Sequence, residues 1–279
     1  MLRIALLGLL GLMPIVYAQE LPTRYSDVAA AEREFAAAGA RDGVQKSFLA
    51  HFAEAAIVLR PFPVSGLKWY REHADPPGGK LIWGPQYLAV SGAGDLGLSS
   101  GPWRYEGEHE GKTAQAHGHF LSIWQRDAHG HWQVLLDHGI GHPAPAIAVE
   151  QTQAEPILLP AAKPLARASA EARKVGLAAA DDDLRARLRT DPKTAYAEVA
   201  SAQTLWLRDG ALPLHGAEPP TAASCGCGPR DLLGIAASGD LGYTVGGAEN
   251  ARGRGADVRV WRFASGHWSL LADVNSAVE

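Results

Sequence analysis

The sequence predicts an α+β protein built from two similar units in tandem, each with helices first and an antiparallel sheet after them. Three observations lead to this prediction. Capped amphipathic segments open each half of the 279-residue chain, short β-type runs close each half, and the same motifs recur in both. A repeat unit of this length buries a core of its own, so the pattern indicates two domains rather than a solenoid.

The repeated motif is a Gly-Asp-Leu-Gly run, at Gly94–Gly97 and again at Gly239–Gly242. Two strand-like segments follow each copy and carry tryptophans, at Trp124 and Trp132 in the first half and at Trp261 and Trp268 in the second. An aspartate between glycines is typical of a turn or bulge, where its carboxylate bonds nearby backbone. We therefore interpret Asp95 and Asp240 as architectural.

The first half is expected to open with two helices, over residues 26–38 and 42–52, because Ser and Asp precede amphipathic runs there. Residues 57–60 read as the first strand. A hairpin of residues 117–126 with 131–140 closes the unit, since apolar and polar side chains alternate along both segments.

The second half repeats this order. Residues 165–180 form an Ala-rich helix that 182–188 extend, and Asp191-Pro192 is a capping residue followed by a proline suited to a first helical turn. Residues 204–208 are the counterpart of the first strand. The predicted divisions are a signal peptide at 1–18, a first domain at 24–142, a proline-rich linker at 143–164 and a second domain at 165–279. Within the linker, Ile157–Leu159 is either extended or docked on a domain.

The N-terminal residues are typical of a secretory signal peptide. Arg3 precedes an apolar run over Ile4–Tyr17, and Val16–Ala18 offers the small residues that a signal peptidase reads. A membrane anchor, the alternative, needs about 20 apolar residues and this run is shorter. We expect cleavage before Gln19 and a bacterial protein that is periplasmic or secreted.

Charge and cysteine content narrow the function classes. The net charge is −4 and the 26 Lys and Arg form no basic run, so no nucleic-acid partner is expected. Cys225 and Cys227 are the only cysteines of the sequence, which excludes a disulfide framework. They can form one small local disulfide or present two thiolates to a soft metal, although two ligands are too few for a closed site.

Several motifs together resemble a known superfamily. In the first half they are Ser91–Gly97, Gly101–Trp103, Gly118–Trp124 and Trp132–Gly139, and the second half repeats them around Ser238, Trp261 and Trp268–Asp273. They are similar to the SnoaL-like, DUF-type (uncharacterised) branch of the nuclear transport factor 2-like (NTF2-like) superfamily. The resemblance implies two tandem cone-shaped α+β barrels of the NTF2-like, cystatin-like type, with helices packed on a curved antiparallel sheet around a pocket. The superfamily holds isomerases, cyclases, dehydratases and binding modules, so the resemblance selects no function.

Histidines are concentrated at the end of the first half. If Arg126 opposes His131 in the hairpin, then His119 opposes His138, and His117 shares their face. That face is otherwise apolar, so we expect it to point inward.

The second half provides an internal comparison, because Arg254, Ala256 and Val274 stand at the three corresponding positions. The fold therefore does not need the imidazoles. Three imidazoles on an inward face are suited to acid–base chemistry or to metal binding.

These patterns give the candidate site residues. His119 and His138 are the candidate catalytic residues, and the candidate ligand-binding residues are His117, Trp69, Tyr70, Trp83 and Tyr87. No metal or other cofactor is predicted, with a His117, His119 and His138 metal site kept as the alternative. Core packing of the aromatic residues, and satisfied or exposed histidines, are the competing structural interpretations.

Three functions remain open. The first is an exported protein that binds a small apolar or aromatic molecule in the first domain. The second is an isomerase, cyclase or dehydratase that uses a first-domain histidine as general base. The third is a non-catalytic interaction module in which the two domains form an intramolecular pseudo-dimer, or two chains a homodimer. An open cavity reaching His119 would favour chemistry, and a filled one would favour the interaction module.

Overall fold

The structure of the protein is a computed structural model. It describes residues 23–109, 112–146, 148–151, 155–220, 224–250 and 253–276. The predicted signal peptide, residues 1–18, lies outside the described residues. Among the helices that are described, none is both long and apolar enough to cross a membrane.

Helices and strands alternate in the first half in an order that begins with two helices, as predicted. Its elements are α1 Thr23–Asp42, α2 Val44–His51, β1 Phe52–Leu59, β2 Pro63–Ser65, α3 Gly66–Glu72, β3 Lys80–Trp83, β4 Tyr87–Val90, β5 Leu96–His109, β6 Lys112–Arg126 and β7 Trp132–His142. The segment that follows holds the short helix η1 (Val149–Gln151) and β8 (Glu155–Ile157). Strand β8 pairs with β4, so this part of the predicted linker docks on the first sheet.

The second half also begins with two helices and continues with strands. Its elements are α4 Arg167–Arg187, α5 Pro192–Val199, β9 Leu205–Arg208, β10 Leu214–His215, β11 Ser224–Cys225, β12 Arg230–Ile235, β13 Leu241–Asn250, β14 Gly253–Ala264 and β15 His267–Asn275. The predicted start of α5 is confirmed, because Pro192 opens the helix and the Asp191 carboxylate accepts a hydrogen bond from the Thr194 N–H at 3.2 Å.

The two sheets have matching strand orders. The first runs β2-β1-β7-β6-β5-β4-β8 and the second β10-β9-β15-β14-β13-β11, with β3 and β12 paired to β5 and β13. Both are mixed sheets, although a purely antiparallel sheet was predicted. The first and last strands of each unit, β1 with β7 and β9 with β15, run parallel. Parallel neighbours need a long crossover, and the intervening helices and hairpins of each unit provide it.

The registers match as well. Ser122 on β6 opposes Asp137 on β7, and Arg259 on β14 opposes Asp273 on β15. Each hairpin has its irregularity at the same place, just before Trp124 on β6 and just before Trp261 on β14. These paired positions allow the two interiors to be compared residue by residue. That the halves are copies of one ancestral domain, and where their boundaries fall, stays a prediction.

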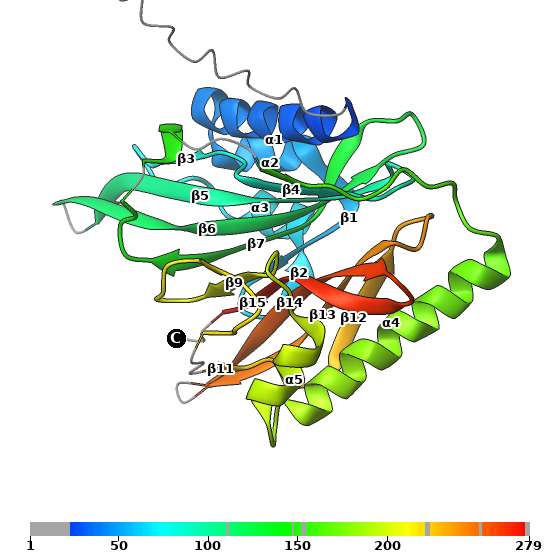
Figure 1. Ribbon diagram of the computed structural model, residues 1–279. Helices are drawn as coiled ribbons and strands as arrows, with labels where there is room; N and C mark the ends of the chain where they lie inside the picture. Colours follow the sequence, from blue (N-terminus) through cyan, green and yellow to red (C-terminus); the bar gives the residue numbers. More distant parts are fainter. Residues whose placement is uncertain are drawn as a thin grey trace, which may run out of the picture.

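The molecule has four layers, which Figure 1 shows from one edge. Helices α1 and α2 cover the outer face of the first sheet, α4 and α5 cover the second, and the inner faces of the two sheets meet. A single apolar core joins both inner faces, and it includes Leu121, Leu136, Val258 and Leu271. Burial of apolar surface therefore holds the halves together as well as each half separately.

The two Gly-Asp-Leu-Gly loops bind each other. Asp95 accepts a hydrogen bond from the Ala237 N–H at 2.7 Å, and Asp240 accepts one from the Gly92 N–H at 2.8 Å. The relationship is reciprocal, as in a two-fold symmetric dimer interface. The architectural interpretation of the two aspartates therefore extends beyond their own turns to the contact between the halves.

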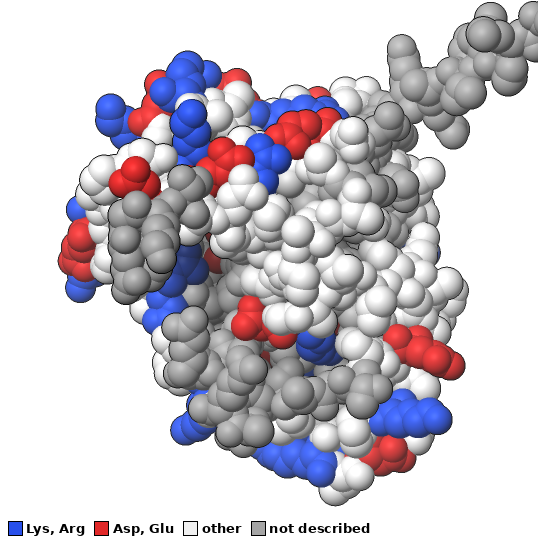
Figure 2. Space-filling view, turned by 90° about the vertical axis from the view of Figure 1, so that its left-hand side faces the viewer, with Lys and Arg blue, Asp and Glu red and all other residues white. Residues whose placement is uncertain are grey.

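The molecular surface carries both signs of charge. In Figure 2, Lys and Arg side chains are interspersed with Asp and Glu side chains, and uncharged surface lies between them. A binding face for nucleic acid would instead gather basic residues in a stripe or patch.

Candidate functional site

The first half contains a cavity of about 550 Å³ between its helices and the outer face of its sheet. Its walls come from α2, α3, β3, β5, β6 and β7, and six of its side chains are aromatic: Phe48, Tyr70, Trp83, Trp103, Tyr105 and Phe120. Cavities of this size accept small organic molecules.

Two glycines keep the cavity open on the sheet side. Gly118 opposes Trp103 in the β5–β6 ladder, and a Cβ at Gly118 would overlap the indole ring. Gly139 opposes Phe120, and a Cβ there would lie 3.3 Å from the Trp103 Nε1 atom. The absence of both side chains lets the indole lie across the sheet and leaves space beside it.

Asp137 is the carboxyl group in the cavity wall. It lies on β7, is only partly covered because it faces the cavity, and accepts a hydrogen bond from the Ser122 hydroxyl at 2.9 Å. Burial raises the pKa of Asp137 to about 6, against the lowering effects of the Ser122 hydrogen bond and the Arg60 charge. The carboxyl group can therefore gain or lose a proton near neutral pH.

Arg60 and Tyr70 line the same cavity, and of the two Arg60 is exposed and Tyr70 is buried. The Arg60 guanidinium donates a hydrogen bond to the Tyr70 hydroxyl at 3.3 Å and lies 5.7 Å from the centre of a Trp69 ring. Burial raises the pKa of Tyr70, so its phenol stays protonated and can donate. The cavity thus offers one cation, two phenols and two carboxyl groups in an aromatic lining.

A second carboxyl group, Glu32 on α1, is fully buried behind the wall. It accepts hydrogen bonds from the indole N–H groups of Trp83 at 2.7 Å and Trp124 at 3.0 Å. Burial raises the pKa of Glu32 to about 7, the Trp83 hydrogen bond opposes the rise, and the nearby Asp137 charge adds to it. Because Trp83 also lines the cavity, Glu32 fixes the orientation of one of its walls.

The second half contributes one residue to the cavity. Asp209, at the end of β9, lines it and accepts a hydrogen bond from the Gly141 N–H at 2.8 Å. The Gly210 N–H in turn donates to the Gly141 carbonyl at 2.7 Å. Strand β7 is therefore held on the cavity side by a loop from the other half.

The corresponding interior of the second half is filled by charged side chains. Its buried ionic network consists of Asp181, Arg185, Arg208, Asp257, Arg259 and Asp273. Arg259, at the position matching Ser122, bonds Asp273 at 2.8 Å and Asp181 at 3.1 Å. Burial alone would raise the pKa of Asp273, but Arg208 and Arg259 hold it below its usual value.

The other ion pairs of the buried network occupy the remaining interior of the second half. Arg185 reaches from α4 to make two hydrogen bonds of 2.8 Å with Asp257, and Arg208 pairs with Asp273 at 2.7 Å. The first half has Phe120 where the second has Asp257, and it has no buried arginine among its described residues. The same fold therefore holds a packed ionic core in one half and an aromatic cavity in the other.

The predicted pairing of His119 with His138 is wrong. His119 opposes Ile140 and His138 opposes Leu121. The turn is one residue longer than assumed, so Arg126 pairs with Trp132, and the bulge before Trp124 shifts the register once more.

Both imidazoles do lie on the apolar face of the hairpin, but this face packs against the second sheet. The His119 Nδ1 atom is 3.1 Å from the His142 Nε2 atom, away from the cavity. His138 borders the cavity, and His117 is partly exposed outside it. Burial lowers the pKa values of His119 and His138 to about 3, which makes them weak bases.

The predicted aromatic residues divide into two groups. Tyr70 and Trp83 line the cavity. Trp69 stacks on His73 with 3.7 Å between ring centres, beside Arg60 rather than in the wall. Tyr87 lies 4.2 Å from the His215 ring between the two halves. Of the four aromatic residues predicted for the site, two line the cavity and two lie outside its lining.

The alternative metal site is not assembled. Within the residues that the structure describes, no group of three or more His, Cys, Asp or Glu side chains is placed to hold a metal ion. His117, His119 and His138 are spread along two strands instead of converging on one point.

Asp137, Arg60 and Glu32 were missed as site residues. A signal for two of them is present in the sequence, because Asp137 has its counterpart in Asp273 and Arg60 in Arg208. Charged residues at matching positions of two predicted core strands are unusual, since buried charges are costly unless paired. That signal indicates charged residues in the interiors of both halves, but it does not indicate which interior contains a cavity.

Comparison with known proteins finds matches among solved structures. No family model matches the sequence, and no curated protein sequence matches it either. Similar solved structures include a putative ketosteroid isomerase from Shewanella frigidimarina (18% identity, TM-score 0.33, 40% of this chain and 93% of that one). Another is an NTF2-like superfamily protein from Salmonella enterica (12% identity, TM-score 0.35, 47% of this chain and 98% of that one). A third is the CaMKII hub of S. rosetta (16% identity, TM-score 0.35, 42% of this chain and 95% of that one).

The Salmonella protein carries the name of the superfamily that the sequence resembles. Each of these neighbours covers less than half of this chain.

Proposed function

We propose that this is an exported protein that binds a small apolar or aromatic molecule in the cavity of its first half. The observation that carries the proposal is the cavity itself, about 550 Å³ lined by six aromatic side chains, two carboxyl groups and one guanidinium. Apolar walls with a few convergent polar groups are the usual composition of a small-molecule site.

The second half supports the proposal by contrast. Its interior has the same backbone pairing, yet Arg185 and Arg259 fill it with hydrogen bonds to buried aspartates. A cavity of this size lowers the stability of the fold because packing contacts are lost, and the second half shows that side chains can fill the same space. Its persistence in one half favours a ligand as its occupant.

Binding is tested with 1-anilinonaphthalene-8-sulfonate, whose fluorescence rises in an apolar site. Gly139→Leu places a side chain in the cavity beside Trp103 and is expected to weaken binding at least tenfold. Gly139→Ala adds one carbon, whose nearest neighbour is the Trp103 Nε1 atom at 3.3 Å, and is expected to bind within about threefold of wild type. Equal binding by all three proteins would place the probe elsewhere and contradict the proposal.

A second function is general acid–base catalysis in the same cavity, with Asp137 as the base. The favouring observation is its position in the wall together with a pKa raised to about 6. Such a carboxylate is ionised at neutral pH and more basic than an ordinary aspartate. The Tyr70 phenol and Arg60 guanidinium could stabilise negative charge that develops on a ligand. This replaces the predicted histidine base, because His119 lies outside the cavity and is weakly basic.

Catalysis is tested by solvent deuterium exchange into 2-indanone, a small aromatic ketone with acidic C–H bonds, followed by NMR. The exchange rate with wild-type protein should rise as pH passes about 6, where Asp137 loses its proton. Asp137→Asn should abolish that rise, and His119→Ala should retain it. Exchange that is unchanged in Asp137→Asn would remove the catalytic role and leave the binding proposal intact.

Export rests on the apolar run over Ile4–Tyr17 and the small residues before Gln19. Mass spectrometry of the periplasmic or secreted protein should find an N-terminus at Gln19. Recovery of the full-length chain in the membrane fraction would contradict export.

The third function, an interaction module, describes two domains packed as an intramolecular pseudo-dimer. The inner sheet faces do bury each other within one chain, while the aromatic cavity of the first half favours the two small-molecule functions.

A further inference from the structure

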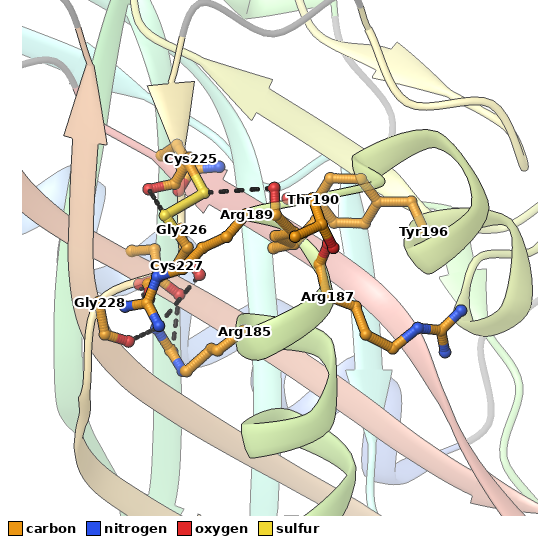
Figure 3. The surroundings of a disulfide bond; sticks show 12 residues. Arg185, Arg187, Arg189, Thr190, Tyr196, Cys225, Gly226, Cys227 and Gly228 are labelled. Carbon is orange, nitrogen blue, oxygen red and sulfur yellow. Dashed lines mark hydrogen bonds and ion pairs between the residues drawn. A yellow bond between two sulfur atoms is a disulfide. The ribbon is translucent and has the colours of Figure 1, made fainter.

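Cys225 and Cys227 form a disulfide across a single intervening glycine, in the segment that joins β11 to β12. This segment lies at the end of the second half, against the last turn of α4 and the residues after it (Figure 3). Cys225 is partly exposed, and Cys227 is 6% exposed. Cys225 is therefore the more accessible of the two residues to a reagent in solution.

A disulfide of this span contributes little as a structural cross-link. In the chain-entropy account, its stabilisation grows with the number of residues in the loop it closes. A sequence separation of two restricts few conformations of the unfolded chain. Stability of the fold therefore does not account for this bond.

Hydrogen bonds to the backbone hold the same segment in place independently of the sulfurs. Arg185 donates to the carbonyl groups of Gly226 at 3.4 Å and Gly228 at 3.2 Å, and Arg259 donates to that of Gly226 at 2.6 Å. Arg189 donates to the Cys227 carbonyl. The loop is thus anchored to three arginines whether or not the disulfide is present.

These arginines also set the chemistry of the two sulfurs. Figure 3 shows the Arg185 and Arg189 side chains pointing toward the Cys-Gly-Cys segment, and Arg187, between them in sequence, pointing away. A nearby cation stabilises a thiolate relative to a thiol and makes it a better leaving group. Arg189 bonds the carbonyl of Cys227, the more buried of the two cysteines, so we expect the Cys227 sulfur to be the one that leaves as a thiolate.

We propose that Cys225–Cys227 is a thiol–disulfide exchange site whose substrate is a dithiol. A substrate thiolate attacks the Cys225 Sγ atom, the bond between the two sulfurs breaks, and its electron pair leaves on the Cys227 Sγ atom as a thiolate. The second substrate thiol loses its proton to solvent and attacks the mixed disulfide. This oxidises the substrate to a disulfide and releases Cys225 as a thiolate. The chain gains two electrons and the substrate loses them.

The first test uses the full-length folded protein and dithiothreitol as the dithiol. Native buffer with millimolar dithiothreitol should reduce the bond, with two thiols per chain by alkylation and mass spectrometry. Circular dichroism should stay unchanged, because the arginine contacts keep the loop in place. Reduction that requires denaturant would overturn the proposal.

The second test compares two arginines on the same helix end. Arg189→Gln removes the cation next to Cys227, while Arg187→Gln removes one that pairs with Glu198 and Asp183. The alkylation rate of the reduced protein by iodoacetamide at pH 7 should fall about three- to tenfold in Arg189→Gln, because fewer thiolates form. It should stay at the wild-type value in Arg187→Gln. Equal rates in the two variants would overturn the proposal.

Discussion

The interiors of the two halves start from the same strand pairing and reach opposite solutions. Where the first half has Ser122 opposite Asp137, the second has Arg259 opposite Asp273. In the second half the cation pairs the carboxylate and fills the space. In the first half the carboxyl group faces a cavity lined by aromatic rings.

The difference teaches how one fold separates stability from function. Asp273, a buried carboxylate paired with Arg208 and Arg259, has a pKa below its usual value and stays ionised. A buried carboxyl group without an adjacent ionic partner keeps its proton to higher pH, as in Asp137 and Glu32. The first half can keep carboxyl groups of the second kind, because the second half and the shared apolar core contribute stability to the whole chain.

The largest expected effect comes from breaking the ionic core. Arg259→Ser installs the residue type of the first half and leaves Asp181, Asp257 and Asp273 without this cation. Removal of one partner from a buried charge pair costs about 3–5 kcal/mol, so the free energy of unfolding in urea should fall by that amount. Arg262→Ser, on the same strand but partly exposed, is the control and should cost less than about 1 kcal/mol. Equal losses would show that the network is not a stabilising core.

The reverse exchange should close the cavity. Ser122→Arg places a guanidinium beside Asp137, where it can pair with that carboxylate and occupy the space next to Phe120. Binding of 1-anilinonaphthalene-8-sulfonate should weaken at least tenfold, and the pKa of Asp137 should fall below about 6 in carboxyl NMR. Unchanged binding by a folded Ser122→Arg variant would contradict the equivalence of the two positions.

The raised pKa of Glu32 predicts a pH effect on stability. Its value of about 7 in the folded protein exceeds the 4.5 of an ordinary glutamate, so the folded state holds this proton more tightly. The stabilisation is complete below about pH 4.5 and is lost as pH rises through about 7, a change of about 3 kcal/mol.

Glu32→Gln stays neutral, so its free energy of unfolding should lack this decline between about pH 5 and pH 8. Glu34→Gln, exposed on the same helix, should keep the wild-type slope. If Glu32→Gln and wild type share one pH dependence, the carboxyl group is not buried as described.

The smallest expected effect concerns the contact that is alike in both halves. Asp95→Asn and Asp240→Asn each weaken one charge-assisted hydrogen bond between the repeated loops, and each should cost about 1 kcal/mol in urea unfolding. Asp231→Asn, on an exposed strand, should cost nothing measurable. A large difference between the two loop variants would show that the contact is not reciprocal in energy.

The sequence predicted the features that depend on repeated local patterns. The paired Gly-Asp-Leu-Gly loops and the tryptophan strands lie at matching places in the two sheets, and α5 begins at Pro192 behind its aspartate cap. Turns and helix starts depend on the side chains of neighbouring residues, so both can be predicted from a short stretch of sequence.

The site could be predicted only in part, for two physical reasons. The sheet of the first half has two apolar faces, one toward the helices and one toward the second sheet, and alternation cannot tell which is which. The histidines were therefore assigned to the wrong layer. The bulge before Trp124 also leaves no mark in the alternation, although it shifts the partner of His119. The short α3 that carries Tyr70 lacks the length that makes a helix periodic.

The most direct test of the account is a crystal structure of the protein with 4-bromophenol bound, in which anomalous scattering locates the bromine. The account predicts one bromine site in the first half, in the cavity between Trp103 and Phe120 and within reach of Asp137, and none in the interior that Arg259 fills. Bromine in the second-half interior, or none in the first-half cavity at a saturating concentration, would contradict it.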